Sequence, residues 1–299
     1  MRRLPSILII RLAVLLATPL SGVAAVSAQD PIDVDKRLGQ YVAVELTMDV
    51  SKLSASDRKM IPLLIEAAKI MDDCFWYEAY GNRDQLLGSI SDSDLRRFAE
   101  INYGPWDRLD GNRPVVPGFA GKPPGANFYP TDMSKDEFER AELTGKDGLY
   151  TFIRRRPDGS LTVVPYRVQF ADAMKRAAKL LVRAADMSED AGLSRYLKLR
   201  AEALLTDDYQ PSDLAWLEMK DNTIDVVIGP IENYEDKLYG YKTAHECFVL
   251  VKDKDWSKRL ARYADFLPQL QATLPVPDRY KQEKPGSDTE LNAYDVIYY

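Results

Sequence analysis

Residues 225–251 read DVVIGPIENYEDKLYGYKTAHECFVLV and give the clearest indication of the fold. A β-branched run comes first and is broken by Gly229 and Pro230, and a second apolar run, FVLV, closes the segment. Between the two runs lies a polar stretch that contains Glu232, Asn233, Tyr234, Glu235 and Asp236. Two strands with a short acidic and aromatic turn between them form a rigid support that presents polar groups to a ligand. We therefore predict a strand pair with a candidate binding site at its turn.

The regions on either side predict an α+β fold that is mostly helical, with a small β-barrel or sheet. Ser54 and Asp57 have the spacing of a capping box, which begins a helix. Apolar residues then recur at helical spacing and form one face, made of Met60, Leu64, Ala67, Ala68, Met71, Cys74 and Phe75. Before this helix, apolar and polar residues alternate over residues 42–48, which predicts a half-buried strand.

The remaining elements follow from the same rules. Two apolar runs flank the turn-forming sequence RPDGS at residues 156–160, which predicts a hairpin. Periodic apolar residues predict helices over residues 168–187, 193–205, 212–219 and 256–274. Residues 292–299 read NAYDVIYY and contain the residue types that favour strands. Residues 102–130 hold the prolines, glycines and aromatic side chains of an ordered loop.

The first 28 residues have the layout of a secretory signal peptide. A basic head with Arg2 and Arg3 precedes an apolar stretch over residues 7–20, and a cleavage site follows just before Gln29. We therefore predict an exported protein of residues 29–299. It would have no membrane span after signal removal, because no later stretch reaches the ~20 apolar residues of a spanning helix. The formal net charge of −6 argues against nucleic acid or anionic lipid as a partner.

Residues that commonly carry catalysis are scarce. His245 is the single histidine of the sequence, so a zinc site with two histidines cannot be built, and we interpret His245 as structural although Glu246 follows it. A serine-nucleophile elbow and a phosphate-binding glycine loop are also missing from the sequence. Cys74 and Cys247 are interpreted as buried free thiols, although an exported chain could pair them. The acidic residues 206–213 lack the ligand spacing of a calcium loop and are interpreted as helix-capping.

The polar turn at residues 232–236 has more than one interpretation. Its carboxylates, Glu232, Glu235 and Asp236, could flank a sugar bond as a glycosidase pair, but the sequence does not fix their separation. A turn that joins two strands and binds nothing is the simpler alternative. The residues by themselves leave these alternatives open.

The pattern IGPIE-x-Y-x-D at residues 228–236, with an aromatic-rich stretch and FVLV after it, resembles the dipeptidyl-peptidase III family of zinc metallopeptidases. The resemblance covers nearly all of residues 29–299 in general layout and is sharpest over residues 221–251. It implies that residues 29–299 are the substrate-binding lobe of a two-lobed enzyme. The chain would be the amino-terminal part of a bacterial exported member, truncated before the zinc motif.

The resemblance also implies roles for matching residues. Glu232 would bind the free amino terminus of a peptide, and Tyr234 would stabilise the oxyanion that forms at the scissile carbonyl. Asn233 and Asp236 would support this binding site. The peptide substrate would add as a strand to a sheet edge, where backbone pairing tolerates many sequences.

The family's zinc motif does not occur in this sequence. We therefore expect no cofactor in this chain, and zinc only in a full-length parent, whose carboxy-terminal lobe would be its partner. Two functions follow. The first is the peptide-binding part of an exported zinc exopeptidase that releases dipeptides from amino termini, inactive as this chain alone. The second is a non-catalytic peptide-binding or interaction protein, and either would act in the periplasm of a Gram-negative bacterium.

Overall fold

The computed structural model describes residues 33–282 and 291–299. The long helix α2 (Ala55–Ala79) organises the fold. The signal peptide predicted for residues 1–28 lies outside the described residues. The predicted capping box is present: the Ser54 hydroxyl accepts from the Asp57 amide at 3.0 Å, and the Asp57 carboxylate accepts from the Ser54 amide at 3.2 Å. Every residue of the predicted apolar face is buried, which confirms that face.

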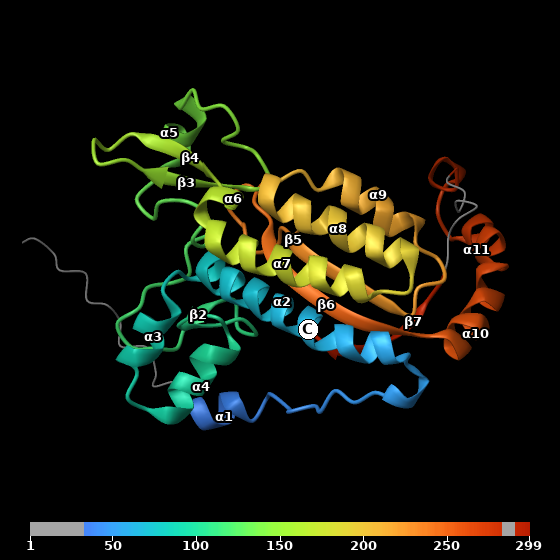
Figure 1. The fold of residues 1–299 in the computed structure, drawn as a ribbon. Helices are drawn as coiled ribbons and strands as arrows, with labels where there is room; N and C mark the ends of the chain where they lie inside the picture. The colour runs from blue at the N-terminus through green and yellow to red at the C-terminus, as the bar shows by residue number, and fades with distance from the viewer. Residues whose placement is uncertain (1–32, 283–290) are drawn as a thin grey trace, which may run out of the picture. The chain divides into compact units, whose positions relative to one another are not determined.

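Three further helices stack beside α2, as Figure 1 shows. The helix α7 (Ala171–Met187) packs on α2, α8 (Ala191–Thr206) packs on α7, and α9 (Gln210–Glu218) packs on α8. Small buried residues such as Ala177 and Ala184 allow the helix axes to approach closely. The helices predicted over residues 168–187, 193–205 and 212–219 are thus confirmed. A short separate helix, α6 (Tyr166–Gln169), precedes α7. Among the described helices, none combines the length and apolar character needed to cross a membrane.

A three-stranded antiparallel sheet packs against α2. Its strands are β5 (Ile224–Glu232), β6 (Ala244–Asp253) and β7 (Ala293–Tyr298), in that order across the sheet. β5 and β6 confirm the strand pair predicted around the polar turn, and β7 confirms the strand predicted at residues 292–299. Alternate residues of the first two strands are buried as partners, for example Val226 opposite Val249 and Ile228 opposite Cys247. The sequence predicted either a small β-barrel or a small sheet. The described strands form open sheets and no closed barrel, so the second alternative is the one found.

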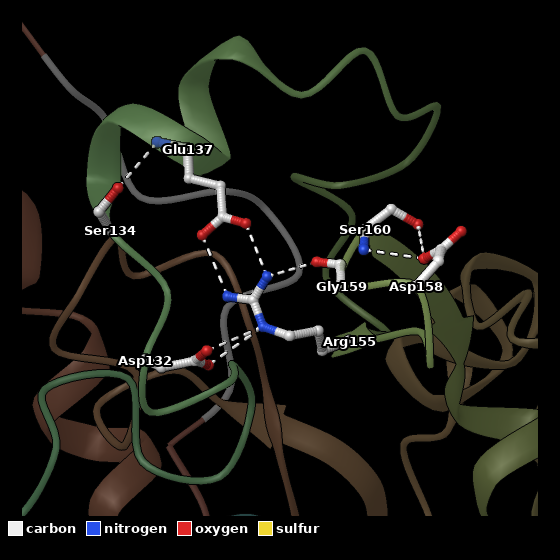
Figure 2. Close-up of polar contacts among 7 residues, drawn as sticks. All are labelled: Asp132, Ser134, Glu137, Arg155, Asp158, Gly159 and Ser160. Carbon is white, nitrogen blue, oxygen red and sulfur yellow. Dashed lines mark hydrogen bonds and ion pairs between the residues drawn. The ribbon is translucent and has the colours of Figure 1, made fainter.

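The predicted hairpin is formed by β3 (Thr151–Arg155) and β4 (Leu161–Pro165). Arg155 ties it to the helix α5 (Lys135–Arg140), as Figure 2 shows. The Arg155 guanidinium donates to both carboxylate oxygens of Glu137, at 2.7 and 3.1 Å, and pairs with Asp132 at 3.0 Å. Because a bidentate pair fixes orientation as well as distance, the hairpin and α5 form one substructure.

The predicted loop over residues 102–130 packs on the body of the protein, with Trp106, Phe128 and Tyr129 buried. It includes two short strands, β1 (Trp106–Asp107) and β2 (Arg113–Pro114). Cys74 and Cys247 are both buried and free, which confirms their interpretation. The remaining short elements are α1 (Val34–Leu38), η1 (Val50–Lys52), α3 (Arg83–Ser89), α4 (Ser93–Ile101) and η2 (Asp278–Tyr280).

Two predictions of regular structure are wrong. Residues 42–48 form no strand, and the side chains of Val42 and Val44 are 82% and 74% exposed. Alternation yields a strand only where a sheet edge lies alongside, and the described sheets place none there. The helix predicted over residues 256–274 is divided into α10 (Lys254–Ala264) and α11 (Leu267–Thr273). Pro268 lacks an amide hydrogen and its ring obstructs the preceding turn, so a new helix starts there.

Candidate functional site

The end of β5 leaves regular strand geometry just before the predicted site. Gly229 has a φ of +126°, and a Cβ atom there would lie 3.2 Å from the Tyr209 ring, so this position favours glycine. The register of β5 against β6 then shifts between Pro230 and Glu232. A shift of this kind reorients the side chains that follow it. The next three side chains, those of Glu232, Asn233 and Tyr234, are all exposed.

Asp236 organises the turn from inside. Its carboxylate is buried and accepts hydrogen bonds from the amides of Leu238 and Tyr239, at 3.0 and 3.2 Å. It also accepts from the amides of Tyr241 and Lys242, at 3.0 and 3.1 Å, and from the Tyr129 hydroxyl at 2.8 Å. All five bonds are internal to the protein. Asp236 therefore fixes the conformation of the loop between the strands, on which the exposed residues depend.

Tyr234 and Glu246 form the polar pair of the site. Tyr234 is 49% exposed, and its hydroxyl donates a hydrogen bond to the carboxylate of Glu246 on β6. Partial burial, and secondly the bond to Glu246, raise the pKa of Tyr234 above its ordinary value. Burial also raises the pKa of Glu246, although its bond from Tyr234 opposes that shift. The Tyr234 hydroxyl therefore keeps its proton in neutral solution and remains a hydrogen-bond donor.

Glu235, next to Tyr234, is the centre of a buried ion-pair cluster. Arg108 donates to its two oxygens at 2.9 and 3.2 Å, and the Lys122 ammonium pairs with one of them. Burial by itself would raise the pKa of Glu235, but Arg108 and Lys122 together hold it below its ordinary value. The sequence places these partners more than a hundred residues away, so the cluster ties the loop at residues 102–130 to the turn after β5.

A cavity of about 310 Å³ lies beside this cluster. Tyr234 and Glu246 line one side of it, and further walls come from α2, the loop after α4 and the end of β7, through Asp72, Phe75, Tyr103, Arg108 and Tyr298. The Arg108 guanidinium lies 5.3 Å from the Phe75 ring centroid. Aromatic walls with a few convergent polar groups are typical of ligand sites. Of the predicted site residues, Tyr234 lines the cavity; Glu232, Asn233 and Asp236 do not.

His245 is committed to the core. Its backbone amide and its Nδ1 atom lie 2.7 and 2.6 Å from the two carboxylate oxygens of Glu78 on α2, and both side chains are fully buried. The rings of Tyr166 and Phe170 pack against it. This confirms the structural interpretation of His245. Within the described ranges no group of three histidine, cysteine or carboxylate side chains is placed to hold a metal, so these described residues do not fit a zinc site.

Metal analysis tests this conclusion. We expect purified residues 29–299 to contain no stoichiometric zinc after dialysis, because the described residues bring no three histidine, cysteine or carboxylate side chains together around one point. The measurement is elemental analysis of the protein against its buffer. One tightly bound zinc per chain would contradict the expectation.

Sequence reasoning missed Glu246, Arg108 and Lys122. The strand alternation of β6 contained a signal for Glu246, since its neighbours His245 and Cys247 are buried and Glu246 must then lie on the less buried face. For Arg108 and Lys122 the sequence held no signal, because only the folded loop brings them to Glu235. The acidic stretch at residues 206–213 serves helix ends as interpreted, with Asp207 capping α8 in left-handed conformation.

Comparison with known proteins supports the fold. The profile of peptidase family M49 matches residues 156–296. The dipeptidyl-peptidase III of Caldithrix abyssi has a TM-score of 0.81 and 37% identity over 88% of this chain and 52% of its own. That of Corallococcus sp. strain EGB has a TM-score of 0.78 and 33% identity over 89% and 52%. Nudix hydrolase 3 of Arabidopsis thaliana is 30% identical over 329 aligned residues, 89% of this chain and 42% of the plant protein.

The fold and the matched sequence define a lobe of a metallopeptidase-type protein. The chain belongs to the dipeptidyl-peptidase III family, peptidase family M49. It spans about half the length of the relatives it matches.

Proposed function

We propose that the chain is the peptide-binding lobe of an exported, zinc-dependent exopeptidase that releases dipeptides from peptide amino termini. The observation that supports this most is the placement of Tyr234. Its hydroxyl keeps its proton, the residue lines a cavity, and the exposed Glu232 precedes it by two residues. An anion two residues before a neutral donor matches a peptide end, which offers a charged amine and carbonyl oxygens in close succession.

In this proposal each residue has a separate task. Glu232 pairs with the free amino group of the peptide and so sets the distance from the end at which cleavage occurs. Tyr234 exchanges its bond to Glu246 for one to the carbonyl oxygen under attack, where negative charge develops. Asn233, whose amide donates to the Gly240 carbonyl at 3.3 Å, and Asp236 hold the turn that presents both.

Hydrolysis distinguishes this role from that of a non-catalytic peptide-binding protein. The informative protein is a chimera that joins this chain to the part of the Caldithrix abyssi dipeptidyl-peptidase III that it does not match. Release of dipeptides by the chimera would support the peptidase lobe. A folded chimera that binds peptides and leaves them intact would favour the second role.

Glu232→Ala tests the binding step directly. A charge-assisted hydrogen bond is worth roughly 1.5–3 kcal/mol, so this variant is expected to bind peptides with a free amino group about 10- to 150-fold more weakly. Peptides with an acetylated amino group should already bind poorly to the unaltered chain and lose little more. The measurement is titration calorimetry with each peptide.

The matched control is Glu202→Ala, which removes an exposed carboxylate from α8. It should leave the affinity for both kinds of peptide unchanged. Equal losses of affinity for free and acetylated peptides in Glu232→Ala would show that Glu232 does not bind the amino group and belongs to a turn that only joins two strands.

A further inference from the structure

We propose that a second cavity beside Tyr234 binds a carboxylate of the peptide ligand, an inference that rests on the function proposed above. This cavity has a volume of about 200 Å³. It is lined by Asn112, Pro123, Pro124 and Tyr234 together with four charged residues, Arg108, Lys122, Glu235 and Lys237. We call it the cationic cavity. Three cations facing one carboxylate leave an excess of positive charge, which attracts an anion.

Lys122 is the first reason to infer a ligand. Its side chain is only 9% exposed and lies 5.6 Å from the centroid of the Trp106 ring. Burial of an ammonium group costs free energy, and burial accordingly lowers the pKa of Lys122 to about 8. Glu235 already has a bidentate partner in Arg108, at 2.9 and 3.2 Å. The buried Lys122 is therefore a second cation at a carboxylate that one arginine already satisfies.

Lys237 supplies a positive charge that no described ion pair neutralises. Its backbone amide donates to the Pro124 carbonyl at 2.8 Å, which fixes its position on the wall of the cavity. Its side chain is exposed, and its ammonium forms no ion pair with the residues that the structure describes. Its charge opposes that of Lys122 and contributes to the lowered pKa of Lys122. An incoming anion would relieve this repulsion.

The position of the cavity indicates which anion it receives. Tyr234 and Arg108 line both this cavity and the larger one, which Glu246 also lines. A peptide whose carbonyl contacts Tyr234 therefore carries its neighbouring groups past the cationic cavity. A volume of about 200 Å³ accommodates a side chain with a terminal carboxylate. The carboxylate can come from an aspartate or glutamate side chain or from the carboxyl terminus of a short peptide.

The test compares peptides that differ in one charge. Tetrapeptide amides of alanine, with glutamate or glutamine at each position in turn, are titrated into the purified chain. A side-chain carboxylate in the cavity should give about tenfold tighter binding of the glutamate peptide at one position, because a charge-assisted bond is gained at a partly exposed site. The unsubstituted alanine tetrapeptide as free acid and as amide forms the second arm. A preference for the free acid with no glutamate preference assigns the cavity to the carboxyl terminus.

Substitutions locate the preference. Two ratios measure the preference: the glutamate-to-glutamine affinity ratio and the acid-to-amide affinity ratio. In Lys122→Met and in Lys237→Met, whichever ratio the unaltered chain shows should fall to a value between about 1 and 3. Lys237→Met removes an exposed side chain, so it keeps the test valid if Lys122→Met fails to fold. Lys179→Met is the matched control, because it removes an exposed lysine from α7 outside both cavities, and it should keep the full ratio.

The pH and salt dependence provide a readout that a structural role would not move. The Lys122 ammonium faces Arg108, Glu235 and Lys237 and is charged below its pKa of about 8. The carboxylate preference should therefore be full near neutral pH and decline as the pH rises through about 8. It should also weaken with added salt, because exposed charges are screened.

The outcomes separate this inference from the proposed function. Equal binding of acidic and neutral peptides in both arms overturns the carboxylate site and leaves the peptide-binding role intact. If no peptide binds, the proposed function fails, and titration with N-acetylglutamate then decides: binding that Lys237→Met abolishes keeps an anion site, and no binding overturns it.

Discussion

Replacing Glu78 by leucine is expected to lower the free energy of unfolding by about 3–5 kcal/mol. The substitution leaves the backbone amide of His245 buried without its acceptor and the ring Nδ1 buried without its hydrogen-bond partner; the Glu78 carboxylate oxygens now lie 2.7 and 2.6 Å from these two atoms. Unpaired buried polar groups of this kind cost far more than the lost bond contributes. The measurement is urea unfolding followed by circular dichroism.

A second substitution on the same helix serves as the control. Glu66→Leu also removes a carboxylate from α2, but Glu66 is exposed and its ion pair with Lys69 lies at the surface. Its effect should stay within about 0.5 kcal/mol. The double variant Glu78→Leu with His245→Phe should recover part of the loss, because a phenyl ring needs no hydrogen-bond partner while the backbone amide still needs an acceptor. An unfolding midpoint of Glu78→Leu equal to that of the unaltered protein would contradict the central role of this pair.

Replacing Tyr234 by phenylalanine is expected to lower kcat of the chimera by about 10²-fold with little change in KM. The phenyl ring preserves the shape of the cavity and removes only the hydroxyl. Because that donor acts mainly when charge develops on the carbonyl oxygen, its loss affects the transition state more than the bound peptide. The measurement is steady-state hydrolysis of a dipeptidyl arylamide.

Tyr263→Phe is the matched control, since it removes the hydroxyl of a well exposed tyrosine on α10. It should leave kcat and KM unchanged. A Tyr234→Phe chimera with unaltered kcat would show that the Tyr234 hydroxyl serves only its bond to Glu246.

The two expectations concern neighbouring parts of one strand pair. His245 anchors β6 to α2, and the next residue, Glu246, receives the Tyr234 hydroxyl. Consecutive residues of a strand point to opposite faces. The buried pair therefore supports the position of the candidate site from the opposite face of β6, and loss of stability in Glu78→Leu should be accompanied by weaker peptide binding.

Elements whose causes are local in sequence could be predicted correctly. The capping box of α2 spans four positions, the RPDGS turn spans five, and the apolar face of α2 follows from helical spacing. The strand pair around residues 232–236 was predictable because both runs and the break between them lie within one short segment. The failure at residues 42–48 has the opposite cause: a strand needs a partner, and no local pattern states whether a sheet edge will be present.

The candidate site divides in the same way. The sequence by itself determined that Glu232, Asn233 and Tyr234 would lie at a turn between strands. The family pattern within it indicated Glu232 and Tyr234 as the candidates for contact with a peptide. Only the tertiary structure decided that the Asp236 carboxylate would make all its hydrogen bonds within the protein. It also decided that Glu246 would accept a hydrogen bond from Tyr234. The same packing brings Arg108 and Lys122 to Glu235. Those pairings join residues up to 127 positions apart. Their geometry depends on how the helices and the loop at residues 102–130 pack, which no short-range pattern encodes.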